Sequence, residues 1–244
     1  MTCIVKLYKQ PQLEDPFLIE GLPGIGLVAN LATSFLIKEL NAKLFGEAFS
    51  SSFQGVAITK AKGELGFPAS RLYYHKRRNG ERDLILLYGT TQALTTRGQY
   101  ELCWRLLETV ETLGCRQVIT LGGYRPGREV TEPRLYYAAS DAEMALEAEG
   151  LEAENLKGRI FGVAGLLVGL CRPRGMRGYC LLAETPGDHP DKVAAREILR
   201  ALTTVLHLTL DLSKDITPLE EIAEAKSPKL GPPEDRKASP RWFV

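Results

Sequence analysis

The sequence predicts an α/β fold. Two observations predict it: short apolar runs of strand length alternate with segments of helical periodicity, and several of the runs are followed by glycine turns. With 244 residues, the chain is long enough for one large domain or two small ones. A globule of this size buries roughly 70–75% of the surface that its unfolded chain exposes, so it needs no disulfide or metal to be stable.

The first part of the chain holds a strand, a glycine turn, a helix and a hairpin. Phe17-Leu18-Ile19 is typical of a strand, and the apolar stripe from Leu27 to Leu40 has helical spacing. Residues 71–88 are typical of a β-hairpin that turns at Asn79-Gly80, the strongest short hairpin signal. The second arm of this hairpin, Leu84 to Tyr88, is nearly all apolar, which predicts a position in the centre of a sheet.

The alternation continues to about residue 212. The predicted elements are a helix over 99–113 that stops at Gly114, a strand over 117–121, an acidic helix over 142–157, a strand over 179–183 and a helix over 193–207. We therefore expect the folded domain to span residues 1–212. Residues 213–226 are predicted to hold a short C-terminal helix, and residues 227–244 a flexible proline-rich tail, because Ser227 to Pro240 contains four prolines among charged and small residues.

Charge and composition argue against several classes of protein. The chain has 31 basic and 30 acidic side chains, a formal net charge of +1, which disfavours a nucleic-acid binder or a polybasic membrane anchor. The longest apolar run, residues 160–171, is about half as long as a membrane span. The five cysteines form no C-x-x-C pair and are interpreted as buried thiols. We expect a cytoplasmic protein without a metal site.

The glycine turn E-G-L-P-G-I-G-L-V contains two incomplete nucleotide-binding patterns. Gly21 and Gly26 have the spacing of a P-loop, but Leu27 and Val28 stand where that loop needs Lys and Ser or Thr. Gly24 and Gly26 fit a dinucleotide fingerprint, although Leu22-Pro23 lengthens the turn beyond the tight bend which that motif requires. We interpret the turn, including Pro23, as structural: its glycines would permit positive φ and close helix packing, while the helix N-terminus could hold an anion.

A second candidate site is the loop A-E-T-P-G-D-H-P-D, which gathers Glu184, Asp188 and His189 after an apolar strand. Carboxylates beside a histidine can perform acid–base chemistry. Asp188 and Asp191 are equally expected as helix caps. An alternative function is therefore a small-molecule or nucleotide-binding enzyme that uses the Gly21–Gly26 turn together with this loop, although no nucleophile–base signature such as G-x-S-x-G occurs.

The chain ends in R-W-F-V, with Trp242 and Phe243 among its last three residues. Two inserted aromatic rings would contribute several kcal/mol of gross binding energy, and the carboxylate of Val244 offers a charge-assisted hydrogen bond. The tether before them reaches roughly 20 Å on average. Alternatively, the two rings fold back onto an apolar groove of the chain itself.

Four segments, in this order, resemble the proteasome assembly chaperone family of archaea and some bacteria. They are L-I-E-G-L-P-G-I-G-L-V-A-N-L-A, L-G-C-R-Q-V-I-T-L-G-G-Y, G-V-A-G-L-L-V-G-L and L-L-A-E-T-P-G-D-H-P-D-K-V-A-A-R-E-I-L, and the resemblance covers about residues 15–212. It implies a single α/β domain with a mostly parallel, helix-flanked sheet that resembles purine nucleoside phosphorylases, without their catalytic groups.

The resemblance also implies a function. Members of the family form homo-oligomers, and some dock a C-terminal hydrophobic–Tyr–any-residue tail into pockets of the proteasome α-ring. The matching triplet here is Trp242-Phe243-Val244, in which Phe243 departs from the tyrosine of the family. The implied protein is a non-enzymatic, ATP-independent assembly chaperone or proteasome-binding factor. It would have no cofactor, and its partners would be the α-ring and further copies of itself.

Overall fold

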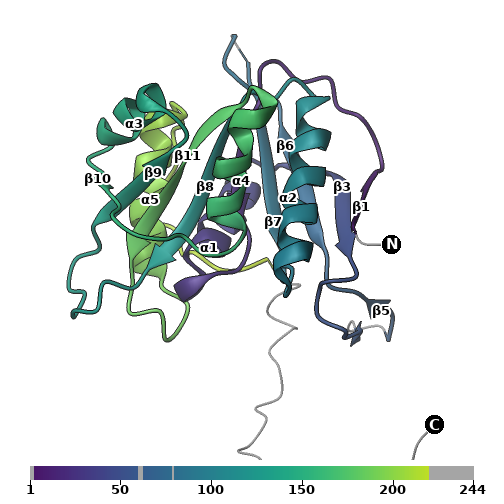
Figure 1. Ribbon diagram of the computed structural model, residues 1–244, viewed down its shortest axis with the longest axis horizontal. Coiled ribbons are helices and arrows are strands. Elements are labelled where there is room, and N and C mark those ends of the chain that lie inside the picture. The colour runs from purple at the N-terminus through teal and green to yellow at the C-terminus, as the bar shows by residue number, and fades with distance from the viewer. Residues whose placement is uncertain (1–2, 60–62, 79, 220–244) are drawn as a thin grey trace, which may run out of the picture.

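The computed structural model describes residues 3–59, 63–78 and 80–219, and within them a nine-stranded sheet has helices on both faces (Figure 1). In sheet order, the strands are β1 (Cys3–Leu7), β3 (Lys43–Ser50), β6 (Ser70–His75), β7 (Leu84–Gly89), β2 (Phe17–Gly21), β8 (Gln117–Tyr124), β11 (Arg177–Glu184), β9 (Leu135–Ala139) and β10 (Glu154–Asn155). The α-helices of the described part are α1 (Val28–Glu39), α2 (Thr96–Glu111), α3 (Ala142–Glu149), α4 (Val163–Cys171) and α5 (Lys192–Val205). Two 3₁₀ turns, η1 (Ile25–Leu27) and η2 (Arg172–Arg174), and a small hairpin of β4 (Ile58–Thr59) and β5 (Leu65–Gly66) complete it.

The four central strands, β7, β2, β8 and β11, run parallel to one another. Every residue of β2 and β7 is buried, as expected for strands with a helical layer on each face. Antiparallel strands extend the sheet on both sides, with β6, β3 and β1 beyond β7 and with β9 beyond β11. The predicted single α/β domain with a helix-flanked, mostly parallel central sheet is confirmed.

Two helical layers bury the two faces of the sheet. Figure 1 shows α2 and α4 in front of the sheet and α1 behind it. Because side chains alternate along a strand, Leu18 of β2 packs into the layer of α2 and α4, whereas Ile19 packs into the layer of α1 and α5. The same alternation sends Leu86 and Leu87 of β7 into opposite layers.

The hairpin predicted for residues 71–88 is confirmed, since β6 and β7 pair antiparallel with His75 opposite Leu84, while Asn79 of the predicted turn lies outside the described residues. The connection is longer than a two-residue turn. It is held by the buried carboxylate of Asp83, which accepts hydrogen bonds from the backbone N–H groups of Arg77 and Glu14 at 2.6 and 2.8 Å. Gly80 has a φ of +74°, in the left-handed region that favours glycine.

The helix predicted over residues 142–157 is too long. Helix α3 ends at Glu149, Glu152 has a φ of +60°, and the chain then forms β10, which pairs parallel with β9. Residues 150–157 do not continue the helix, although their composition favours one. Pairing with β9 gives the backbone of β10 hydrogen-bond partners, and Leu156 N–H donates a further hydrogen bond to the carbonyl of Tyr137.

The apolar run of residues 160–171 contains α4, a helix that the sequence analysis did not predict. The two glycines of α4, Gly165 and Gly169, lower its intrinsic helix propensity. Packing against α2 and the sheet compensates, since Val163, Leu167 and Cys171 are fully buried on one side of the helix.

The chain remains packed on the domain beyond residue 212. Ile216 is buried, and the carbonyl of Thr217 accepts hydrogen bonds from Ser34 Oγ and Lys38 Nζ of α1 at 2.8 and 3.0 Å. The helix predicted for residues 213–226 is not formed over 213–219, where Pro218 also disfavours helical backbone at the residue before it. The rest of that segment lies outside the described residues.

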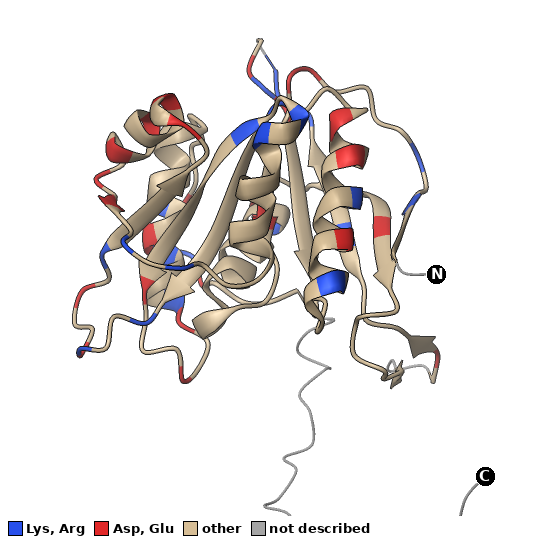
Figure 2. Ribbon diagram, in the orientation of Figure 1, with Lys and Arg blue, Asp and Glu red and all other residues tan. Residues whose placement is uncertain are grey.

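The structure also places the cysteines and the charged residues, and it bears on the question of a membrane span. All five cysteines are buried thiols, as predicted. Figure 2 shows acidic residues gathered on α3 and residues of both charge signs along α2. Within the described ranges, no helix has the length and apolar character needed to cross a membrane.

Candidate functional site

The glycine turn joins β2 to α1 by close backbone packing. A Cβ on Gly21 would lie 1.9 Å from Thr33 Oγ1 and 2.7 Å from the carbonyl oxygen of Ala29, so α1 passes too close for any other residue. Gly26 has a φ of +62°, and Leu27 after it has a φ of +48°. Gly24 is extended, with a φ of −151°, and a Cβ there would meet nothing within 4 Å. The left-handed positions are therefore Gly26, which glycine adopts without strain, and Leu27, which is strained, whereas Gly24 is extended.

Side-chain amides fasten this turn to the ends of neighbouring elements. Asn30 Nδ2 donates hydrogen bonds to the carbonyls of Gly21 and Gly89, at 3.3 and 2.9 Å, which ties the ends of β2 and β7 to α1. Gln92 Nε2 donates to the carbonyl of Pro23 at 2.5 Å, while Gln92 Oε1 accepts from Val163 N–H at 3.2 Å. Gln92 thus links the turn to the first residue of α4.

The second predicted loop packs directly on the first. Asp191 N–H donates to the carbonyl of Gly26 at 2.8 Å, and Thr185 Oγ1 donates to Asp191 Oδ2 at 2.7 Å. Asp191 Oδ1 accepts from Val193 and Ala194 N–H, so Asp191 is the N-cap of α5. The close approach of the two loops also depends on Gly123, where a Cβ would lie 2.3 Å from the carbonyl oxygen of Ile25.

The acid–base residues predicted in this loop are not brought together. Glu184 is fully buried and is bound by Arg128 Nη2 at 2.5 Å, by Tyr136 Oη at 3.1 Å and by Arg134 N–H at 3.3 Å. Asp188 is exposed and pairs with Arg125 Nη2 at 2.9 Å. His189 is also exposed. Glu184 therefore anchors the loop to β9, and the arrangement shows no histidine held against a carboxylate.

Glu20 is a buried acidic side chain that none of the sequence patterns singled out. It lies on β2 directly before the glycine turn, and its side chain is 1% exposed. Burial raises the pKa of Glu20 to about 8, although hydrogen bonding from the backbone of Leu22 opposes this rise. A single Glu within the apolar strand F-L-I-E-G is the signal that could have drawn attention to it.

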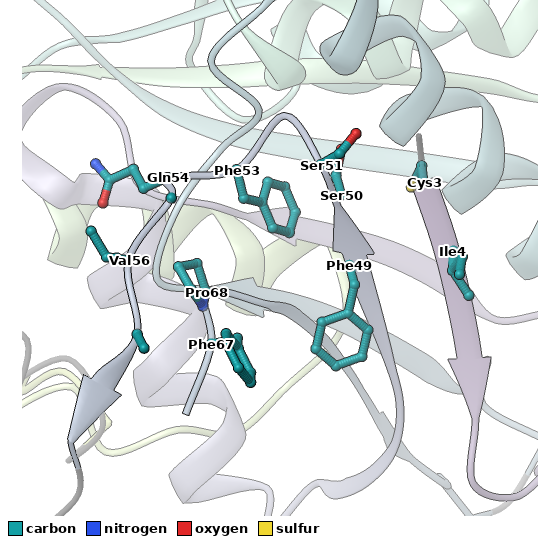
Figure 3. A pocket seen from close by; sticks show the side chains of 12 residues that line it. Cys3, Ile4, Phe49, Ser50, Ser51, Phe53, Gln54, Val56, Phe67 and Pro68 are labelled. Carbon is teal, nitrogen blue, oxygen red and sulfur yellow. The ribbon is translucent and has the colours of Figure 1, made fainter. Parts of the chain in front are cut away.

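An apolar groove opens beside the edge of the sheet that is formed by β1. Figure 3 shows the rings of Phe49, Phe53 and Phe67 around a cavity of about 530 Å³, which Ile4 and Val56 also line. Phe67 is 64% exposed and Val56 50% exposed. Exposed apolar side chains grouped in this way mark surfaces for protein contact more often than isolated ones do.

The apolar groove continues around Cys3 into a second hollow on α2. Cys3 lines both, and the second is formed by Tyr100 and Trp104, with the guanidinium of Arg174 4.6 Å from the centre of the Trp104 ring. The neighbouring strand β1 is five residues long and is the last strand of the sheet on this side among those described. The predicted tail site, Trp242, Phe243 and Val244, lies outside the described residues.

The fold and these sites define an α/β domain with strand-end loops built by close packing at glycines and with an exposed apolar groove at one sheet edge. A family model described as the PAC2 family matches residues 18–230. An uncharacterised protein of Methanocaldococcus jannaschii is 31% identical over 204 residues, which are 83% of this chain and 78% of that protein. The chain therefore belongs to the PAC2 family.

Two crystal structures from Pyrococcus furiosus are similar to this chain over most of their length. PbaB, described as an archaeal proteasome activator, is 36% identical with a TM-score of 0.82, and the match covers 87% of this chain and 92% of PbaB. PbaA, described as an archaeal homologue of proteasome-assembly chaperone, is 28% identical with a TM-score of 0.73, over 87% of this chain and 84% of PbaA.

Proposed function

We propose that this chain is a non-enzymatic, ATP-independent proteasome-binding factor of the assembly-chaperone or activator type. The observation that carries the proposal is the similarity to PbaB, an archaeal proteasome activator, at 36% identity over 92% of that chain. The similarity to PbaA supports the same partner. The glycine turn and the Glu184 loop fit this role because both serve packing within the domain.

The contact with the proteasome is made by the C-terminal triplet, which docks into pockets of the α-ring. Trp242 and Phe243 supply two aromatic rings, and Val244 supplies a carboxylate for a charge-assisted hydrogen bond. A tether of about 14 residues lets the triplet search roughly 20 Å around its origin. Ordering that tether offsets part of the gain, so a single tail binds weakly.

Weak tails become effective when several are carried by one oligomer. We place the contact between copies of this chain on the apolar groove and the neighbouring edge of β1. A five-residue edge strand beside exposed Phe67 and Val56 is unusual for a surface facing water, and pairing or covering it removes the exposed apolar area. The opposite sheet edge, β10, is only two residues long and so offers little backbone for pairing. Multivalent attachment raises overall affinity by about two orders of magnitude or more.

The tail is tested by titrating purified proteasome α-ring with the intact chain and with a chain truncated after Pro240, using interferometry. We expect the intact chain to bind and the truncated chain to lose binding. Phe243→Tyr, which restores the hydroxyl of the family pattern, should bind at least as tightly, and Lys237→Ala in the tether is the matched control. Equal binding by intact and truncated chains would place the contact on the folded domain instead.

The interface is tested with Phe67→Asp, which introduces a charge into the apolar groove. Analytical ultracentrifugation should show a smaller particle, and binding to the α-ring should weaken about 10²-fold through lost avidity. Leu146→Asp is the control, because Leu146 is as exposed as Phe67 but lies on α3. An unchanged particle size for Phe67→Asp would show that copies associate elsewhere.

A further inference from the structure

The carboxyl group of Glu20 is buried with an incomplete set of partners. Leu22 N–H donates a hydrogen bond to Oε1 at 2.8 Å, whereas Oε2 has no hydrogen-bond partner among the described residues. The amide of Leu121 lies near enough to favour the charged form without completing a hydrogen bond of normal geometry. A buried polar atom without a partner destabilises the fold, because it has given up its hydrogen bonds to water and gained none in the protein. Such an atom in a native fold therefore needs a physical explanation.

Glu20 lines a cavity of about 200 Å³ at the carboxyl ends of β2 and β8, which we call the strand-end cavity. Gly122 and Gly123 of β8 and Gly24 of the turn form one side of it. Open α/β sheets bind ligands at the carboxyl ends of their parallel strands. The cavity is large enough for several water molecules but is below the size range of about 300–1,000 Å³ for drug-sized ligands, so its occupant is small.

The remaining walls of the strand-end cavity are mostly apolar, and their polar members, Gln92, Tyr124 and Arg159, are only partly buried or, for Arg159, exposed. Ile25, Ile160, Phe161 and Leu182 line it, and Ile25 and Phe161 are 47% and 84% exposed, which places them toward its mouth. Gln92 also lines it, but both ends of its amide are already occupied by Pro23 and Val163. Glu20 is therefore the fully buried polar side chain of this cavity with an acceptor oxygen still to be matched.

We propose that the strand-end cavity binds a small, flat, largely apolar molecule with a cationic or N–H-donating end, such as an amidine or an amino-substituted heterocycle, and that this end pairs with Glu20 Oε2. The apolar walls take the body of the molecule, and the nitrogen supplies the hydrogen bond that Oε2 lacks. The strand-end cavity is separate from the tail and from the apolar groove, so a test of ligand binding to it does not depend on whether the chain binds a proteasome.

The test uses three molecules of the same shape: benzamidine, benzamide and benzoate. Each is titrated into the full chain at pH 8.5 by isothermal calorimetry, because the pKa of Glu20 is about 8 and its carboxyl is then largely ionised. Benzamidine should bind saturably, since an amidinium can meet a carboxylate with two hydrogen bonds. Benzamide should bind about tenfold more weakly and benzoate not at all.

Two variants locate the binding. Glu20→Gln removes the charge and should weaken benzamidine binding at least about tenfold. Ala164→Leu keeps Glu20 but adds side-chain volume at a residue that lines the cavity; it should weaken binding by a similar factor. Glu132→Gln, an exposed carboxyl, should change nothing. The proposal is overturned if benzamidine does not saturate, if the three molecules bind alike, or if binding survives both cavity variants.

Discussion

Replacing Glu20 with glutamine should stabilise the domain at neutral and alkaline pH and have little effect near pH 4. The side chain is 1% exposed, and burial raises the pKa of its carboxyl from 4.5 to about 8. Because the pKa in the folded state lies above that in the unfolded chain, folding favours the protonated form. The resulting contribution to stability is fully present below pH 4.5 and is lost as the pH rises to about 8.

The magnitude follows from the two pKa values. The interval from 4.5 to about 8, at about 1.36 kcal/mol per pH unit, corresponds to roughly 5 kcal/mol of lost stability above pH 9. At pH 7 the unfolded carboxyl is ionised while most folded molecules remain protonated, and the loss is about 3 kcal/mol. Whole domains have unfolding free energies of about 5–15 kcal/mol, so this single group makes stability strongly dependent on pH.

The measurement is urea denaturation of wild type and Glu20→Gln at pH 4, 7 and 9. Glutamine does not ionise, and its carbonyl oxygen can still accept from Leu22 N–H, so the difference between the two proteins isolates the ionisation of Glu20. Contributions from other titrating groups are common to both proteins and cancel. Glu132→Gln, an exposed carboxyl, should follow the wild-type curve. A wild type and variant whose stabilities differ by a constant amount across this range would refute the reasoning.

Two further predictions concern packing and charge. Gly21→Ala should destabilise the domain by about 3 kcal/mol, because its Cβ would overlap α1. Gly24→Ala is the control and should change stability by less than about 1 kcal/mol, because a Cβ there meets nothing. Equal melting temperatures for the two variants would contradict the role assigned to the turn. Arg128→Ala should cost roughly 2 kcal/mol in chemical denaturation, because it leaves the buried Glu184 without its ion partner, although Arg128 itself is 43% exposed. Arg125→Ala breaks an exposed pair and should cost no more than about 0.5 kcal/mol, so a loss as large as that of Arg128→Ala would be the contrary result.

Local patterns in the sequence predicted the elements whose stability depends mainly on nearby residues. The hairpin of β6 and β7, the strand β2 and the helices α1, α2 and α5 all follow from apolar periodicity with caps or turns at their ends. In these elements the residues that set the conformation lie within a few positions of one another. The family was likewise evident from short segments of the sequence, and the match over residues 18–230 shows it.

Other elements depend on partners far along the chain. Strand β9 is half-buried and is held by antiparallel pairing with β11, about 40 residues later, and β10 in turn depends on β9. Helix α4 forms despite Gly165 and Gly169 because α2 and the sheet bury its apolar side chains. Apolar periodicity carries no information about such distant partners. The helix predicted from it over residues 142–157 is therefore longer than α3, and α4 was not predicted.

The candidate sites divide in the same way. Sequence alone determined which glycines and carboxylates stand at strand ends, because those positions follow from local turns and apolar runs. Only the tertiary structure decided their roles. It turned Glu184 toward Arg128 and away from His189, placed Glu20 against the strand-end cavity, and gathered Ile4, Phe49 and Phe67 from separate segments into one apolar groove. The physical reason is that burial, pKa and surface shape are set by contacts between residues that are distant in the chain.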